Sequence, residues 1–378
     1  MNAPSRHFHR IAWAAVALAL VVILFGAFVR LSNAGLSCPD WPTCYGKATW
    51  PKLHEVDAAN AAFPERLVER GKAWREQVHR HIAALLGALV FALALLAARQ
   101  RRGGLAAVIG SAALVAVSIP LYMKQAYVAS SLLAAGGEAI LLACAWRWDN
   151  RDFARISAVA LAVIVFQAML GMWTVTWLLK PIVVMAHLLG GLATFSLLLW
   201  IAWRASPSTQ LLAGEARALK KLVWLGLALL AAQIALGGWT SANYAALSCG
   251  TDFPICLGRW WPAMDFSEAF VLWRGIGVDY EGGVLDGAAR SAIQMTHRLA
   301  AIVVSVYLLF LAWRLHRAPG LGHWGWTLIL ALVVQVTLGI GNVMLGLPLW
   351  VAVAHTAGAV LLLALLIGLL ARLRLPLP

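Results

Sequence analysis

The chain has 378 residues, of which 62% are hydrophobic and only 12% are charged, and its mean hydropathy is +0.80. A soluble domain carries about 25% charged residues on its surface, so this composition excludes an ordinary water-soluble protein. The net charge of +14 does not indicate a nucleic-acid partner, because the basic residues form short clusters between apolar runs. The sequence predicts an all-α polytopic protein of the lipid bilayer.

Apolar runs long enough to cross a bilayer, which takes about 20 residues each, occur ten times along the chain. The third and fourth are short and are joined by a tight turn at Lys124 and Gln125. In chain order the predicted spans are Ile11–Leu31, Val78–Ala98, Leu105–Met123, Ala126–Trp146, Ile156–Leu179, Ile182–Ala202, Leu222–Ser241, Ala292–Trp313, Trp324–Leu345 and Leu349–Ala371.

The basic residues predict the orientation of these spans. With a cytoplasmic N-terminus, the inward segments carry most of the arginines, while the short outward turns carry only Lys124 and Lys180. Both termini are therefore expected in the cytoplasm. Two long segments, Ser32–Gln77 and Ala242–Ser291, are expected on the outer side.

The two long segments contain related sequences. LSCPDWPTCYGKATWP begins at Leu36 and LSCGTDFPICLGRWWP begins at Leu247. Similarity continues in the helices, where VHRHIAALLG matches THRLAAIVVS, QAMLGMWTV matches QVTLGIGNV, and MAHLLGGL matches VAHTAGAV. This density of matches indicates an internal duplication.

An insertion interrupts the first copy. His79 and His297 are 218 residues apart, whereas His187 and His355 are 168 apart. The difference of about 50 residues is the length of a transmembrane hairpin, placed at about 105–146. The prediction is two pseudo-symmetric four-helix bundles plus this hairpin, with an N-terminal domain over 1–204 and a C-terminal domain over 205–378.

Histidines occupy repeated positions in the predicted helices. Polar side chains inside a bilayer are costly and usually functional. Helical rise places three of these imidazoles roughly 8–9 Å below the outer boundary, and the fourth near the same level. Facing imidazoles with Gly190, Gly191 and Gly358 beside them suit a flat macrocycle ligated on both faces, so heme is predicted rather than zinc. The four ligands are His79, His187, His297 and His355.

Charged residues flank the first histidine of each copy. Arg80 and Arg298 directly follow His79 and His297 and are candidates to pair with heme propionates, although lipid headgroups would attract them equally. Glu76 precedes His79 by one turn on the same face, and the second copy has Gln294 there. This asymmetry favours chemistry in the first half and storage or electron relay in the second; the alternative is that Glu76 is a hydrated interfacial carboxylate.

Each outer segment also contains a cysteine pair. An oxidising compartment favours disulfides, and the matched placement suggests one bond in each segment. Spacing alone leaves open free redox-active thiols or a bond between segments. Cys144, near the inner end of its span, is expected to be an inert thiol. The paired candidates are Cys38 and Cys44 in the first segment, and Cys249 and Cys256 in the second.

The Glu-x-x-His-Arg sequence from Glu76 to Arg80, four helix histidines in two halves, and a cysteine pair in each outer segment together resemble the heme A synthase family. The resemblance covers the chain from about Phe25 to Ala371, excluding the Leu105–Trp146 hairpin. It implies oxidation of the C8 methyl group of heme O to the formyl group of heme A in a bacterial cytoplasmic membrane. It also implies that His297 and His355 hold heme b, while the substrate heme lies between His79 and His187 with Glu76 beside it.

Partners follow from the same resemblance. The enzyme that produces heme O is one expected partner. A redox partner of unidentified nature is another, because the sequence contains no dinucleotide-binding or P-loop motif.

Two other classes of protein fit part of the pattern. A bis-histidine transmembrane b-type cytochrome would explain the four ligands, but it predicts no functional difference between Glu76 and Gln294. A heme transporter or chaperone would explain the outer sites, but it predicts that heme leaves unaltered. For an enzyme, the sequence leaves open whether a histidine releases the iron to oxygen or water captures an oxidised methyl group.

Overall fold

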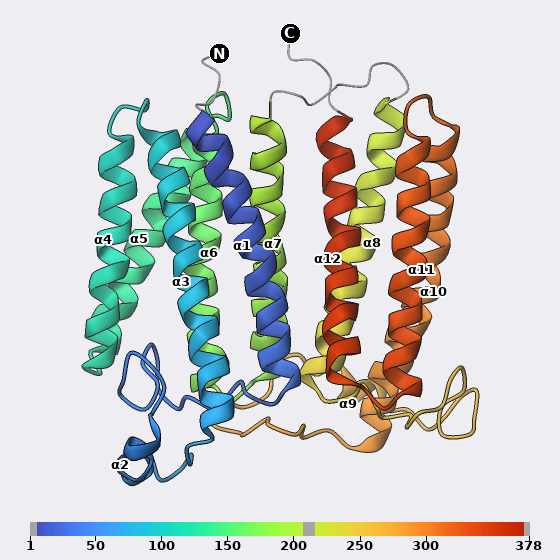
Figure 1. Cartoon of the computed structure of the whole chain (residues 1–378), viewed down its shortest axis with the longest axis horizontal. Coiled ribbons are helices and arrows are strands. Elements are labelled where there is room, and N and C mark those ends of the chain that lie inside the picture. The colour runs from blue at the N-terminus through green and yellow to red at the C-terminus, as the bar shows by residue number, and fades with distance from the viewer. Residues whose placement is uncertain (1–5, 207–215, 374–378) are drawn as a thin grey trace. The chain divides into compact units, whose positions relative to one another are not determined.

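The computed structural model describes residues 6–206 and 216–373 and is helical throughout the membrane-spanning part of those residues. Ten of its helices are long and apolar enough to cross a membrane, which confirms the ten predicted spans. They are α1 (Arg6–Leu31), α3 (Arg70–Ala98), α4 (Gly104–Met123), α5 (Tyr127–Arg147), α6 (Ala154–Thr176), α7 (Pro181–Ala205), α8 (Ala216–Ala242), α10 (Gly287–Arg317), α11 (Gly322–Met344) and α12 (Leu349–Arg372), as Figure 1 shows.

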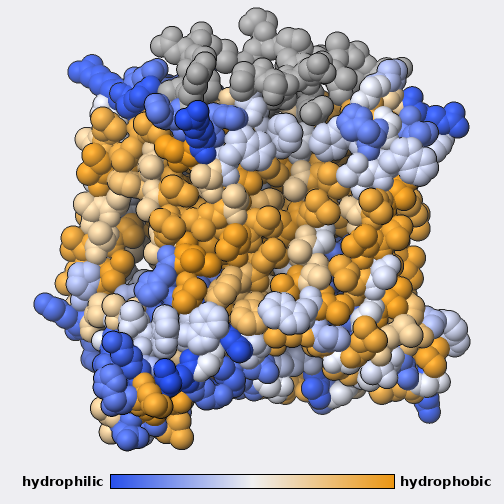
Figure 2. Space-filling view, viewed as in Figure 1, coloured by the Kyte–Doolittle hydropathy of each residue, from blue (hydrophilic) through white to orange (hydrophobic). Residues whose placement is uncertain are grey.

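Short helical elements occur only in the long connections of this described part. They are η1 (Leu53–Glu55), α2 (Val56–Ala62) and α9 (Phe266–Ala269). Hydrophobic residues dominate the middle of the long helices in Figure 2, and hydrophilic residues gather toward their ends. Leu132, Leu330 and Val303 are 61–68% exposed, a degree of apolar exposure that suits contact with lipid rather than water. The chain is a multi-pass membrane protein.

The described helices fall into two compact units. Unit 1 comprises Met1–Thr176 and Gly190–Pro207, and unit 2 comprises Trp177–Leu189 and Ser208–Pro378, so α7 contributes to both. The predicted domains 1–204 and 205–378, and the pseudo-symmetry of the two halves, stay predictions.

Within unit 1, the inserted hairpin forms a close helix pair. Helices α4 and α5 pack against each other, and α5 also packs against α6. Ser111 Oγ donates a hydrogen bond of 2.8 Å to the Gly137 carbonyl, and a Cβ on Gly137 would lie 2.8 Å from the Ser111 carbonyl oxygen. A second bond of 2.8 Å runs from Ser130 Oγ to the Ser118 carbonyl. Small residues and interhelical hydrogen bonds are the usual means of association between helices in lipid.

Two helices begin further out than the apolar runs predict. Helix α3 begins at Arg70 rather than Val78, and α10 begins at Gly287 rather than Ala292. The predicted outer boundaries of these spans were wrong because the added turns are polar and have no hydropathy signal. At α10 the Asp286 side chain accepts a 2.8 Å hydrogen bond from the Ala289 N–H, which is an N-cap that stabilises the additional turn.

The start of α7 is fixed by packing within unit 2. Lys180 directly precedes α7 and is fully buried, and its Nζ lies 3.3 Å from the centre of the Trp273 ring and 5.3 Å from that of Trp177. Such cation–π contacts partly compensate the loss of water around an ammonium group, and burial lowers the pKa of the Lys180 amine. The Tyr280 N–H also donates to the Leu178 carbonyl at 3.0 Å. These contacts fix the start of α7 and therefore the position of His187 along the helix axis, about two turns further on.

Candidate functional site

Two histidines of unit 2 face the interior of its four-helix bundle. His297 on α10 and His355 on α12 lie across the bundle, because both helices pack against α8 and α11. Each ring rests on a glycine of a neighbouring helix. A Cβ on Gly237 would lie 3.2 Å from His297 Cε1, and one on Gly339 would lie 3.0 Å from His355 Cε1.

Hydrogen bonds orient the His355 ring for ligation. Its Nδ1 lies 3.2 Å from the carbonyl oxygen of Gln335 on α11. Since a carbonyl only accepts, Nδ1 carries the proton and Nε2 keeps its lone pair. The Gln335 side-chain amide lies 3.4 Å from Nε2 and can donate to that lone pair. This is the tautomer that a metal-ligating histidine requires.

His297 has a different neighbour. The Gln233 side-chain nitrogen on α8 lies 3.1 Å from His297 Nδ1 and donates to the His297 carbonyl, also at 3.1 Å. The Gln233 Oε1 atom is buried without a hydrogen bond among the described residues. Two neutral imidazoles across one bundle, each with an outer hydrogen-bond partner, fit axial ligation of both faces of a heme iron.

The first half repeats part of this arrangement. His79 lies on α3, and a Cβ on Gly26 of α1 would lie 2.8 Å from its Cε1. Gly26 and Gly237 also correspond in the repeat, because GAFVRLSNAG aligns with GGWTSANYAA. The His79 ring stacks on Phe25, with centroids 6.5 Å apart and an interplanar angle of 16°. His79 belongs to unit 1 and His187 to unit 2, so their pairing stays a prediction.

The small residues near the histidines make room for glutamines. Within unit 1, a Cβ on Gly190 of α7 would overlap the side-chain nitrogen of Gln167 on α6. Within unit 2, a Cβ on Gly358 of α12 would overlap Oε1 of Gln335 on α11. The sequence prediction placed these glycines beside a macrocycle. Their described contacts are with glutamine side chains instead.

Each outer segment holds a disulfide of its own. Cys38 is bonded to Cys44, and Cys249 to Cys256. This confirms one bond per segment and excludes a bond between the segments in this structure. The backbone N–H of the second cysteine donates 2.8 Å to the carbonyl three residues later in both cases. An aspartate carboxylate, Asp40 or Asp252, accepts the N–H of the glycine that closes the turn, at 2.8 or 2.9 Å. We call these two turns the disulfide loops.

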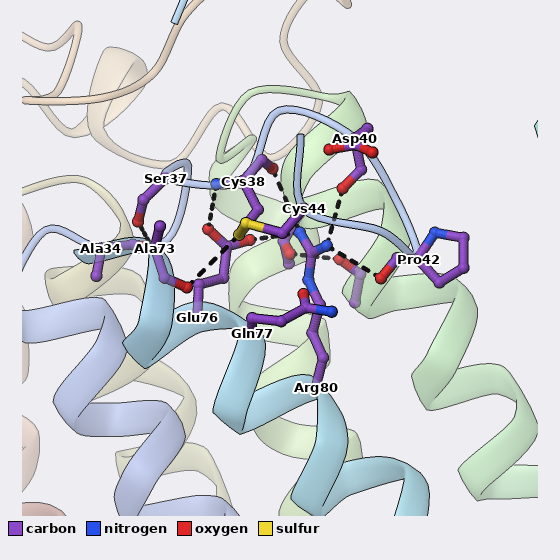
Figure 3. Close-up of polar contacts among 12 residues, drawn as sticks. Ala34, Ser37, Cys38, Asp40, Pro42, Cys44, Ala73, Glu76, Gln77 and Arg80 are labelled. Atoms are coloured by element: carbon purple, nitrogen blue, oxygen red, sulfur yellow. Dashed lines mark hydrogen bonds and ion pairs between the residues drawn. A yellow bond between two sulfur atoms is a disulfide. The ribbon is translucent and has the colours of Figure 1, made fainter. Parts of the chain in front are cut away.

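The two arginines of the site anchor the disulfide loops. Arg80 donates to the carbonyl of Asp40 at 2.8 Å (Figure 3). It also donates to the carbonyl of Thr43 at 2.6 Å. Arg298 donates to the carbonyls of Asp252 and Ile255, both at 3.0 Å. The sequence assigned both guanidinium groups to heme propionates or lipid. Here they lie against the loop backbone, and the propionate role stays untested.

Glu76 connects α3 with the first disulfide loop. Its Oε1 accepts from Arg80 Nη2 at 2.6 Å and its Oε2 accepts the Cys38 N–H at 2.8 Å (Figure 3). The residue is only 4% exposed, so the sequence alternative of a hydrated interfacial carboxylate does not hold. Charge-assisted hydrogen bonds of this kind are about twice as strong as neutral ones. The carboxylate is therefore held in one orientation, one turn from His79.

The disulfides predict a labelling pattern. In intact cells, a membrane-impermeant thiol reagent should label the four loop cysteines only after a reductant is added, because both pairs are bonded. Cys144 should stay unlabelled in both conditions, because it lies within a membrane helix. Labelling of loop cysteines without reductant would contradict stable disulfides in the cell.

Comparison with known proteins agrees with this geometry. The COX15-CtaA family model, described as cytochrome oxidase assembly protein, matches residues 9–121 and 123–367. A heme A synthase of Shewanella oneidensis is 40% identical over 92% of this chain and 91% of its own length. The chain belongs to the heme A synthase family. A heme A synthase of Caulobacter vibrioides is 27% identical over 96% of this chain and 94% of its own.

Membership of the heme A synthase family revises one expectation. The matched ranges run through α4 and α5, whereas the motif-based resemblance excluded the Leu105–Trp146 hairpin. The family match thus includes the hairpin. Sequence reasoning also missed Gln233, and the glycines Gly26, Gly237 and Gly339 that receive the imidazoles. The sequence contained a signal for these glycines. Gly26 and Gly237 begin the aligned segments that precede the two disulfide loops, and Gly339 follows the repeated glutamine in QVTLGIGNV.

Proposed function

We propose that the chain is an oxidoreductase that converts heme O to heme A by oxidising the C8 methyl group of the porphyrin to a formyl group. Three observations support this activity: the family match, the bundle of unit 2 that fits heme, and a buried carboxylate near His79 that unit 2 lacks at Gln294. With water as the source of the oxygen atom, conversion of the methyl group to a formyl group releases four protons and four electrons, and the electrons leave through a redox partner.

The second half holds a resident heme b in this proposal. His297 and His355 are its axial ligands, and Gln233 and Gln335 are their outer hydrogen-bond partners. The glycines beside both rings support the assignment, because a Cβ at either position would come within 3.0–3.2 Å of an imidazole carbon. When bound, heme b supplies one-electron transfer. The residues of the chain would hold it, and the Gln335 carbonyl fixes the tautomer of His355.

The first half holds the substrate in this proposal. His79 and His187 would ligate heme O, and Glu76, one turn from His79 on the same face of α3, would act at its edge. A carboxylate preorganised by Arg80 and the Cys38 N–H can stabilise positive charge that develops near the methyl carbon or orient water toward it, and such electrostatic terms are commonly the largest in catalysis. The second half keeps Gln294 at this position, which fits a heme that is held but not converted.

We further propose a bacterial cytoplasmic membrane location with both termini in the cytoplasm. The distribution of arginines supports this orientation. The disulfide loops would then face an oxidising compartment, where disulfides persist. The enzyme that makes heme O is the proposed donor of substrate.

Conversion in membranes tests the proposed activity. Cells that make heme O but no heme A should accumulate heme A when this chain is produced, as judged by chromatography of extracted hemes. A chain with His187→Ala serves as the matched control, because it keeps the second-half pair. Production of a folded chain in which heme O stays unchanged would exclude the proposed reaction.

A prediction follows for Gln233. Replacing Gln233 with Val, the residue at the corresponding position 22, removes the polar partner of His297 Nδ1. Loss of such an outer-sphere partner commonly lowers metal affinity about 10–100-fold. Titration of the purified variant with heme b should show weaker binding in that range. A change confined to stability, with wild-type affinity and spectrum for heme b, would mean that Gln233 does not support the ligand.

A further inference from the structure

Two arginines of unit 1 lie one turn from the contact between α1 and α3 at His79. Arg75 precedes His79 by four residues on α3, and Arg30 follows Gly26 by four residues on α1. Residues four apart share a helix face. Helix α1 ends where the first outer segment begins, and α3 begins where that segment ends. Arg30 and Arg75 therefore lie nearer to the disulfide-loop end of these helices than Gly26 and His79 do. The Gly26–His79 contact fixes the two faces against each other.

The guanidinium of Arg75 lies within the protein but lacks strong partners. Its Cζ is 5.1 Å from the centre of the Phe28 ring, and its Nε is buried without a hydrogen bond among the residues described. A buried N–H without an acceptor is costly, about 1–3 kcal/mol, and more for a charged group. Arg80, one turn further along α3, is instead saturated by Glu76 and loop carbonyls. Arg75 therefore has donor capacity that its surroundings do not use.

The second half lacks both charges. The positions that correspond to Arg30 and Arg75 are Ser241 and Ile293. Ile293 is fully buried in an apolar cluster of unit 2. The helices, the glycine and the histidine are repeated, while this cationic pair is specific to the first half. A role in helix packing alone would not require two arginines at positions that the second half fills with Ser and Ile.

We propose that Arg75 and Arg30 bind the propionate carboxylates of the porphyrin substrate at His79, and so position and select it. This inference rests on the proposed function of the first half. The propionates project from one edge of a porphyrin, and a ring ligated by His79 can turn that edge toward the loop end. The arginines lie one turn away, about 6 Å along the helix. Their planar forks match carboxylates in a bidentate manner.

Arg75 and Arg30 select for ligands with two free carboxylates, while the histidines bind the iron of the porphyrin. Phe28 supports Arg75 from one side, so the guanidinium loses little freedom on binding. Lipid phosphate at the membrane surface would also attract two arginines. Binding of the arginines to lipid phosphate would not depend on whether the propionates of the porphyrin are charged. This difference distinguishes lipid phosphate from porphyrin carboxylate as the bound anion.

Esterified substrate tests the proposal. The ligands are heme O and its dimethyl ester, titrated into the purified full-length chain that retains heme b in unit 2. Wild type should bind heme O more tightly than the ester. Arg75→Ile, which introduces the second-half residue, should weaken heme O binding on the order of 10-fold and leave ester binding unchanged. Arg30→Ser should act in the same direction, and Arg75→Lys should recover part of the preference. Arg70→Ile, which removes an exposed cation at the start of the same helix, is the matched control and should not alter the preference of the first site.

Several outcomes would overturn the inference. A wild-type preference for heme O over its ester that persists unaltered in Arg75→Ile would exclude carboxylate binding. If the isoleucine variant does not fold, the same result in Arg75→Gln would exclude it. The titration is repeated with the chain in vesicles of different anionic lipid content. Equal weakening of both ligands that varies with that lipid content would assign the pair to lipid phosphate. Failure of the proposed function is distinguishable, because a wild-type chain that prefers heme O but does not oxidise it would retain this binding role.

Discussion

Glu76→Gln should leave heme O unconverted while the chain keeps heme b. Conversion is expected to fall on the order of 10²-fold or more, a magnitude typical of removing one preorganised catalytic group. The substitution removes the charge and also replaces one acceptor oxygen by a donor. That donor must face either Arg80 or the Cys38 N–H, which now meet the two carboxylate oxygens. A loss of about 1–3 kcal/mol in stability is expected as well. The measurement is the ratio of heme A to heme O in extracts.

Arg80→Met separates the two effects. It removes the same ion pair and the loop contacts but keeps the carboxylate. If Glu76 acts on the substrate, Glu76→Gln should lose far more conversion than Arg80→Met at equal protein level. Equal losses in the two variants would mean that conversion depends on the ion pair between Glu76 and Arg80 and not on the carboxylate alone. Wild-type conversion by Glu76→Gln would exclude both roles.

His297→Ala or His355→Ala should abolish the heme b signal of the purified chain. A single remaining imidazole holds the iron weakly, and the low-spin spectrum requires ligands on both faces. The expected loss is nearly complete for either variant, because the two rings lie across the same bundle. Absorption spectra of the reduced protein measure it directly.

The matched control for this loss is His323→Ala. His323 is exposed near the start of α11 and lies away from the bundle interior. It should leave the spectrum unchanged. An unaltered low-spin heme b spectrum in folded His297→Ala protein would show that heme b is ligated elsewhere, and the assignment of the second half would be wrong.

The helices could be predicted well from the sequence, with one kind of exception. Every span has an apolar run of sufficient length, and α7 begins at Pro181 within one residue of its predicted start. The exceptions are the turns that precede the apolar runs, at the starts of α1, α3, α8 and α10. Those turns are polar, and α3 is covered there by the first disulfide loop, whose Cys38 packs with Ala73 in one buried cluster. Such contacts are set by the tertiary structure and leave no hydropathy signal.

The candidate site was less accessible to sequence reasoning. Repeated positions identified the four histidines and the contrast between Glu76 and Gln294. The partners of Arg80 and Arg298 are backbone carbonyls, and a carbonyl acceptor has no residue type that could reveal it. Gln233 was missed for a related reason. Its first-half counterpart is Val22, so a search for shared residues passes over it.

The differences between the halves form a consistent set. The first half has a carboxylate and two arginines near His79, where the second half has Gln294, Ser241 and Ile293. The second half has Gln233 beside its histidine instead. Charge near the first site suits a substrate that binds, reacts and leaves. A neutral, hydrogen-bonded second site suits a heme that stays and exchanges electrons.

Mass analysis of the hemes extracted from the purified chain after incubation with heme O and a redox partner preparation tests the central claim most directly. The account predicts heme A, or its hydroxymethyl precursor, in wild type and only heme O in Glu76→Gln. In both proteins the heme b of the second half should be recovered unchanged. The account would be contradicted if folded wild-type protein that holds both hemes returned only heme O that has gained no oxygen atom. The chain would then be a heme-binding protein without this reaction.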